Sequence, residues 1–157
     1  MGKDWLFKTD DYTCHLRTVG VLIKEDKVLV QRERNGEEYA LPGGTVKTGE
    51  TTEETLIREF EEETGAGIKI QKLLWTEETF WEWNGKKVHG IEFYYLAEAV
   101  KGCEIPDNGE FVSQKDNCNV LLGWMPIEKM KNITIYPEFV KEEINCLDGP
   151  PKHFVSR

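Results

Sequence analysis

Residues 43–67, which read GGTVKTGETTEETLIREFEEETGAG, constrain the fold and the chemistry of this chain more than any other segment. A glycine-rich stretch leads into a helical pattern that carries Glu59, Glu62 and Glu63 at spacings of three and four. On a helix these spacings place the three carboxylates on one face. Folding alone does not favour such stacked like charges, whereas a divalent cation with hard oxygen ligands does. The segment therefore predicts a metal site.

The pattern over residues 51–64 predicts an amphipathic helix. Thr51 or Thr52 can cap its start, and glycines at 65 and 67 lie where a helix C-cap is expected. Leu56, Ile57 and Phe60 form an apolar stripe that can pack on a sheet and leave the glutamates at the rim of a cleft.

Arg58 and the glycines before the helix have predicted tasks of their own. Arg58 is four residues from both Glu54 and Glu62 and can bridge either, so we expect it to hold a glutamate in place. Glycine permits backbone conformations closed to other residues and lets a phosphate or metal approach the main chain. The glycines of this loop are Gly43, Gly44 and Gly49.

The rest of the chain predicts strands and few helices. We expect one hairpin from 15–24 and 27–33, and another from 68–79 and 87–100 with a turn at Asn84-Gly85. A long loop over 101–118, a strand over 120–124, a helical turn over 126–130 and a closing helix over 137–146 should follow. We expect one domain over 1–157, with an N-terminal segment of about 1–14 and an extended tail of about 148–157.

Charge and composition narrow the classes of function. The net charge is −9, and residues 50–63 hold seven Glu and one Arg, which leaves −3 for the rest of the chain. Such a protein lacks the basic face that bulk nucleic acid requires. No apolar run predicts a signal peptide or membrane span, and Cys14, Cys103, Cys118 and Cys146 lack zinc-site spacing. We expect a cytoplasmic protein with reduced thiols.

The register of the loop and helix resembles a known motif. Five residues separate Gly44 from Glu50, and seven more lead to Arg58-Glu59-Phe60-Glu61-Glu62-Glu63-Thr64-Gly65-Ala66. This pattern resembles the Nudix box of the Nudix hydrolase family, which includes MutT-like proteins. Ala66 departs from it, because the family usually has a larger aliphatic residue there, and Ile68 can supply the apolar contact instead.

The resemblance implies an α/β (α+β) fold, a Nudix-type α/β/α sandwich with a central mixed β-sheet. It implies a pyrophosphohydrolase that cleaves a nucleoside diphosphate linked to another moiety X by attack of water on phosphorus. Mg²⁺ or Mn²⁺ would neutralise the anhydride and acidify the attacking water. By analogy, Glu59, Glu62 and Glu63 would bind the metal. Glu62, Glu63 and Arg58 would be catalytic, with Arg58 orienting a glutamate, and Gly43, Gly44, Gly49 and Gly65 would shape the loop.

Related enzymes often use a further acid, and here Glu50 within the box and Glu110 outside it are our candidates. Less favoured acids are Glu104, Asp107, Asp116, Glu77 and Glu78. Aromatic residues after the box could form a base-binding platform, the core or a dimer interface; these are Trp75, Phe80, Trp81 and Trp83.

Several alternatives stay open at this point. The substrate could be an ordinary or oxidised nucleoside triphosphate, ADP-ribose or another nucleotide sugar, or a dinucleoside polyphosphate. A non-catalytic nucleotide sensor and a merely solvated glutamate face are the competing interpretations. A homodimer is common among similar proteins.

Overall fold

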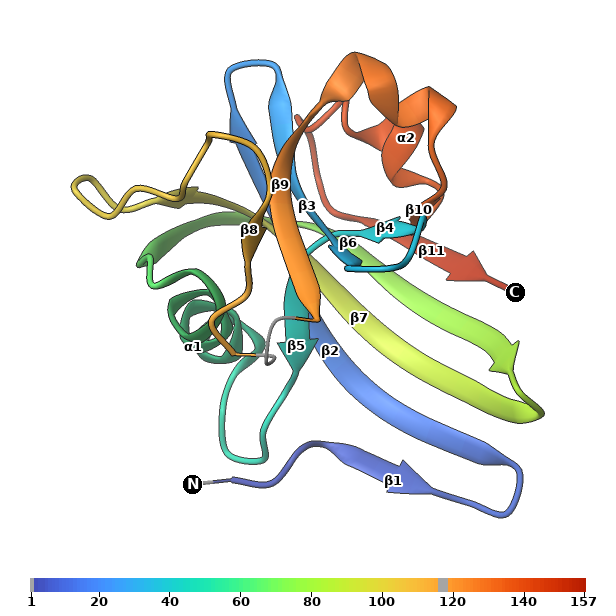
Figure 1. Ribbon diagram of the computed structural model, residues 1–157. Helices are drawn as coiled ribbons and strands as arrows, with labels where there is room; N and C mark the ends of the chain where they lie inside the picture. The colour runs from blue at the N-terminus through green and yellow to red at the C-terminus, as the bar shows by residue number, and fades with distance from the viewer. Residues whose placement is uncertain (1, 116–118) are drawn as a thin grey trace.

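A computed structural model describes residues 2–115 and 119–157 (Figure 1). Asp116, one of the candidate acids, and Cys118 lie outside these residues. No helix among the described residues has both the length and the apolar character needed to cross a membrane.

The centre of the fold is a mixed sheet built around the long strand β2 (Tyr12–Lys24). β7 (Lys86–Ala99) runs parallel to β2, and β6 (Ile68–Trp83) is antiparallel to β7. A hairpin turn leads from β2 into β3 (Lys27–Glu33), which pairs with β9 (Val120–Pro126). The shorter strands on this framework are β1 (Leu6–Lys8), β4 (Tyr39–Ala40), β5 (Gly43–Thr45), β8 (Phe111–Val112), β10 (Ile135–Tyr136) and β11 (Lys152–Ser156).

Alternation of side chains along β2 and β3 divides the core into two faces. Leu22 and Leu29 pack with Leu56 and Phe60 of α1 (Thr52–Thr64). Val21, Val28 and Val30 face the other way, into a cluster with Met130 of η1 (Ile127–Asn132) and Val140 of α2 (Val140–Glu143). Helical segments therefore cover both faces, and Figure 1 shows α1 and α2 at separate places on the sheet. The predicted α/β/α layering around a mixed sheet is confirmed.

Both predicted hairpins are present, and the turn residues explain the second one. Asn84 and Gly85 both have positive φ, as a tight two-residue hairpin turn requires. Two strands are longer than predicted: β2 begins at Tyr12 instead of residue 15, and β6 continues to Trp83 instead of ending at residue 79.

The helix termini of α1 follow from local sequence. The Thr51 side chain accepts a hydrogen bond from the Glu54 backbone N–H, and the Glu54 carboxylate accepts one from the Thr51 N–H, which makes a capping box. Gly65 ends the helix in the left-handed conformation with φ +73°. These caps fix the register of the glutamates between them.

Removing this cap gives the first prediction. Thr51→Ala should lower the free energy of unfolding by about 1 kcal/mol, because the first turn loses a side-chain acceptor. Urea denaturation of both proteins measures the difference. Thr51→Ser keeps a side-chain acceptor and is the matched control, and an equal loss in both variants would contradict the assignment of Thr51 as the cap.

Three predictions about local structure were wrong or incomplete. Ile57 is 39% exposed, and Thr55 is buried in its place, because Ile57 points away from the sheet. The predicted closing helix over 137–146 is regular only at Val140–Glu143; its flanks form mostly tighter turns with i to i−3 hydrogen bonds. The extended C-terminal segment is a paired strand, since β11 lies parallel to β6.

Candidate functional site

A pocket of about 380 Å³ lies where α1 meets β2 and β5. Its walls combine basic, acidic, polar and glycine residues: Arg17, Lys47 and Lys115; Asp4, Glu59 and Glu63; Gln31 and Thr45; Gly43 and Gly44. A polar cleft with both signs of charge suits an anionic ligand that is bound together with a cation.

Gly44 brings the loop and the helix together. It pairs with Thr18 across β5 and β2, so its backbone is held against the sheet. A Cβ at this position would lie 2.5 Å from Glu59 Oε1 and 2.7 Å from Glu59 Cγ. Only a glycine therefore leaves room for the Glu59 carboxylate at the floor of the cleft.

Arg58 links the carboxylates of the motif. Its Nη2 and Nε each donate a hydrogen bond of 3.0 Å to the Glu50 carboxylate. Its Nη1 lies 3.2 Å from Glu59 Oε1 and 3.3 Å from Glu62 Oε1. The hydrogen bond from Arg58, together with one from Thr55, lowers the pKa of Glu50, and the Glu50 bond raises the pKa of Arg58. Arg58 thus bridges Glu62 as predicted, whereas Glu54 serves the cap instead.

Lys115 places a second cation on the same glutamates. Its Nζ lies 2.7 Å from Glu59 Oε2 and 3.3 Å from Glu62 Oε2. Burial alone would raise the pKa of Glu62, but the hydrogen bonds and charges of Lys115 and Arg58 outweigh it and lower that pKa. Burial alone would lower the pKa of Lys115. The hydrogen bonds and charges of Glu59 and Glu62 outweigh this effect and raise the pKa of Lys115.

The interpretation of these glutamates as a solvated helix face fails for two of the three. Glu59 is 3% exposed and Glu63 is 4% exposed, whereas the side chain of Glu62 is 39% exposed. Burying carboxylates is costly unless they are paired or bind a metal. The helix therefore carries its acidic face into the protein.

The chemistry of this donor set fits a hard divalent cation. Glu59 and Glu62 supply carboxylate oxygens that already converge on a cationic group, the ammonium of Lys115. Arg58 and Lys115 between them contact three glutamates, at positions 50, 59 and 62, which leaves one formal negative charge in this group. Within residues 2–115 and 119–157, no three His, Cys, Asp or Glu side chains converge closely enough to hold an ion together.

A buried polar network supports Arg17 at the other wall of the cleft. Arg17 Nε lies 3.5 Å from Glu92 Oε1. Glu77 pairs with Glu92 across β6 and β7, and it accepts hydrogen bonds from the Tyr94 hydroxyl and from the Ser156 hydroxyl of β11. Burial raises the pKa of Glu92 to about 7, and the neighbouring Glu77 adds to the shift although Arg17 opposes it.

This shift predicts that stability falls as pH rises. A carboxyl with an ordinary pKa of 4.5 and a folded pKa of about 7 keeps its proton in the folded state after the unfolded chain has lost it. The free energy of unfolding should therefore drop between pH 4.5 and 7, by at most about 3 kcal/mol from this group. Glu92→Gln should remove that part of the pH dependence, as urea denaturation at a series of pH values will measure. An unchanged profile would contradict the shift.

The other candidate acids lie elsewhere. Glu110 forms an ion pair with Arg32, at 2.7 Å, and Asp107 pairs with Lys24. Glu78 contacts His153. None of these acids is among the residues that line the cleft, and neither is Glu104. Glu50 lies beside the motif through its bonds to Arg58 and Thr55.

The aromatic residues proposed as a base platform do not act as one group. Trp75 is 2% exposed and packs with Tyr94 and Phe139 in the core. Phe80 stacks on His89, at 4.3 Å between ring centroids. Trp81 and Trp83 are exposed near the end of β6, at its hairpin with β7. Among the described residues, no aromatic side chain lines the cleft.

Sequence reasoning did not find several residues of the cleft, which are Asp4, Arg17, Gln31, Lys47 and Lys115. They come from the N-terminal segment, from β2 and β3, and from two loops. Asp4 bridges to the glycine-rich loop at Lys47, and this contact brings an acid from outside the motif to the site. No spacing in the sequence marks these residues, because the sheet pairing brings them together.

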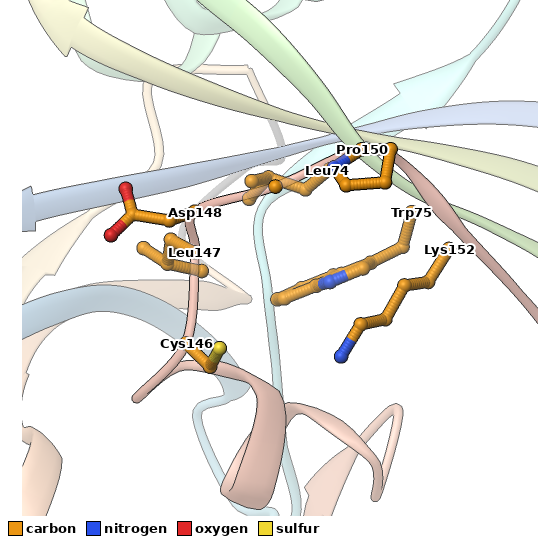
Figure 2. Close-up of a pocket in the computed structure, with 8 residues that line it drawn as sticks. Leu74, Trp75, Cys146, Leu147, Asp148, Pro150 and Lys152 are labelled. Carbon is orange, nitrogen blue, oxygen red and sulfur yellow. The ribbon is translucent and has the colours of Figure 1, made fainter.

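A second hollow lies at the C-terminal segment, and it lacks the features of the first. Figure 2 shows Leu74 and Trp75 of β6 beside residues 146–150 and Lys152, with the Asp148 carboxylate directed away from the indole ring. Its volume of about 10 Å³ suits no more than a water molecule. The cleft at α1 is therefore the candidate site.

Comparisons with known proteins show the family of the chain. The profile of the NUDIX domain family matches residues 15–143. An ADP-ribose pyrophosphatase of Methanocaldococcus jannaschii is 43% identical over 58 residues, 35% of this chain and 34% of that protein. A Mycobacterium tuberculosis protein named mutator protein MutT4 is 29% identical over 100 residues, 64% of this chain and 37% of that protein. The matches thus span only about a third of the length of these relatives.

A solved structure resembles the whole arrangement. The ADP-ribose pyrophosphatase of Streptococcus suis superimposes with a TM-score of 0.59 at 16% identity. The match covers 89% of this chain and 98% of that one. At this identity the likeness concerns the fold.

Proposed function

Because the chain belongs to the NUDIX domain family, we propose that it is a metal-dependent pyrophosphohydrolase that acts on a nucleoside diphosphate linked to another moiety. The observation that carries the proposal is one cleft whose lining combines two motif glutamates of α1, Glu59 and Glu63, with basic side chains of the sheet and loops. Glu62 is not among the lining residues, but it shares the Lys115 ammonium with Glu59. A pyrophosphate bound there would meet cations on both sides.

The carboxylates have separate tasks in this proposal. Glu59, Glu62 and Glu63 would hold Mg²⁺ or Mn²⁺, which when bound supplies charge neutralisation and acidifies a water molecule. The Glu62 side chain is the most exposed of the three, so its carboxylate would be open to the metal and to water.

The basic side chains would hold the substrate. Arg17 and Lys47 line the cleft from the sheet and the glycine-rich loop, where they can bind the anionic oxygens of a pyrophosphate. Glu92 contacts Arg17 from the adjacent strand and so limits the orientations that its guanidinium can adopt.

Arg58 and Glu50 would position the glutamates that bind the metal. The contacts of Arg58 with Glu50, Glu59 and Glu62 hold in place the side chains that would meet the metal. Glu50 orders the loop through Thr55 and Arg58, which supports its role as an assisting acid. Glu110 stays a prediction as the outside acid, and Asp4 joins it because it lines the cleft.

ADP-ribose is the first substrate to test. The Methanocaldococcus jannaschii relative is named for this activity, and its match is the more identical of the two. The mutator protein name of the other relative supports oxidised nucleoside triphosphates as the second candidate. Whether the protein forms a homodimer stays a prediction.

A substrate panel tests the proposal. Purified protein with Mg²⁺ or Mn²⁺ should convert ADP-ribose to AMP and ribose 5-phosphate, and EDTA should stop the reaction. Chromatography of the products from ADP-ribose, nucleotide sugars, and ordinary and oxidised triphosphates ranks the substrates. If every nucleotide stayed intact while binding to the metal-loaded protein, the sensor alternative would replace this proposal.

A further inference from the structure

Lys115 occupies the place between two carboxylates that a divalent cation would also need. Its ammonium lies 2.7 Å from Glu59 Oε2 and 3.3 Å from Glu62 Oε2. Glu59 is 3% exposed, so this contact is made in a region with little solvent. An ammonium and a metal ion cannot lie on the same carboxylate oxygens together, because like charges at such a separation repel strongly.

The anchoring of Lys115 leaves its side chain free to exchange partners. The backbone of the segment is held, since Gln114 N–H donates to the Glu63 carbonyl and Lys115 N–H donates to the Ser113 hydroxyl. The side chain itself is 37% exposed, and a lysine stem has several rotatable bonds. The ammonium can therefore leave the glutamates without any movement of the main chain.

We propose that Lys115 is a built-in cation that competes with the divalent metal for Glu59 and Glu62, so that metal entry requires displacement of its ammonium. This inference rests on the proposed metal site. In the metal-free protein Lys115 keeps the buried Glu59 paired, and it lowers the affinity for the metal. After displacement the ammonium stays at the cleft that Lys115 lines together with Arg17 and Gly44, where an anionic substrate would meet it.

The competition predicts the order of metal affinities in a set of variants. Lys115→Met keeps the length of the side chain and removes its charge, and it should bind Mn²⁺ roughly tenfold more tightly than the unaltered protein. Lys115→Arg keeps the charge and should bind Mn²⁺ as weakly as the unaltered protein. Lys47→Met removes a positive charge from the same cleft and controls for the general field, so its effect should be much smaller.

Calorimetric titration of Mn²⁺ into each metal-free protein, without nucleotide, measures these affinities. The Mn²⁺-induced rise in Tm gives a second readout, and circular dichroism confirms that each variant is folded. Equal affinities for Lys115→Met and the unaltered protein, or equal gains for Lys115→Met and Lys47→Met, would overturn the inference alone. Absence of Mn²⁺ binding in every folded variant would overturn both the inference and the proposed metal site.

Discussion

Glu62→Gln is expected to lower kcat by about 100-fold or more while the protein stays folded. Glutamine preserves the size of the side chain but can neither carry the negative charge that attracts a metal nor accept a proton from water. Glu62 is also the most exposed of the three motif glutamates, so the substitution should change the stability little. Steady-state hydrolysis of ADP-ribose across a range of Mg²⁺ concentrations measures the loss.

Glu61→Gln is the matched control for this experiment. Glu61 is the neighbouring residue on the same helix and is also exposed, whereas Glu62 contacts Arg58 and Lys115. Its replacement should leave kcat within about twofold of the unaltered value, which is within the scatter of surface substitutions. If Glu62→Gln were as active as Glu61→Gln, the role assigned to Glu62 would be wrong.

Alanine substitution at Gly43 and at Gly44 should have different effects, on stability in the first case and on metal binding and kcat in the second. A Cβ at Gly43 would lie 2.8 Å from Val19 Cα and would also meet the Thr18 carbonyl group, so the strand itself must shift. Gly43→Ala should therefore cost about 1–3 kcal/mol of unfolding free energy. A Cβ at Gly44 meets the Glu59 carboxylate instead. Gly44→Ala should displace that side chain and lower metal affinity and kcat.

The two variants control for each other. Urea denaturation should show the larger loss of stability in Gly43→Ala, and Mn²⁺ titration should show the larger loss of affinity in Gly44→Ala. The reverse order, or unchanged metal binding in Gly44→Ala, would contradict the account of how the loop meets the helix.

The parts of the fold that could be predicted are those fixed by local sequence. The Thr51 cap, the Gly65 terminus and the Asn84-Gly85 turn are decided by residues that lie within one turn of each other. The spacing of Glu59, Glu62 and Glu63 is likewise local. The sequence therefore predicted the acidic helix and both hairpins.

The remaining parts depend on partners that are distant in the chain. β11 is a strand because it pairs with the edge of β6, which lies 77 residues earlier in the chain, as in the pairing of His153 with Thr76. Burial of Ile57 was wrongly predicted because helical periodicity does not say where the sheet ends. Lys115 is 56 residues from Glu59, and no motif links them.

Residues that line the cleft from outside the motif could not be predicted from the sequence for the same reason. Arg17 lies on β2 with ordinary neighbours in the sequence, and its position above the glycine loop follows from the pairing of Arg17 with Thr45. Asp4 reaches the site through its bridge to Lys47. A single sequence could identify the residues on the helix, whereas the other residues of the cleft required the three-dimensional structure.

Hydrolysis of ADP-ribose in ¹⁸O-labelled water, with product analysis by mass spectrometry, tests the proposed metal-dependent attack of water on phosphorus. With Mg²⁺ or Mn²⁺ present, one ¹⁸O atom should appear in a phosphate group of AMP or ribose 5-phosphate. Glu62→Gln should show little of this product at the same protein concentration. Intact ADP-ribose and intact nucleoside triphosphates after incubation with folded, Mn²⁺-bound protein would contradict this proposal.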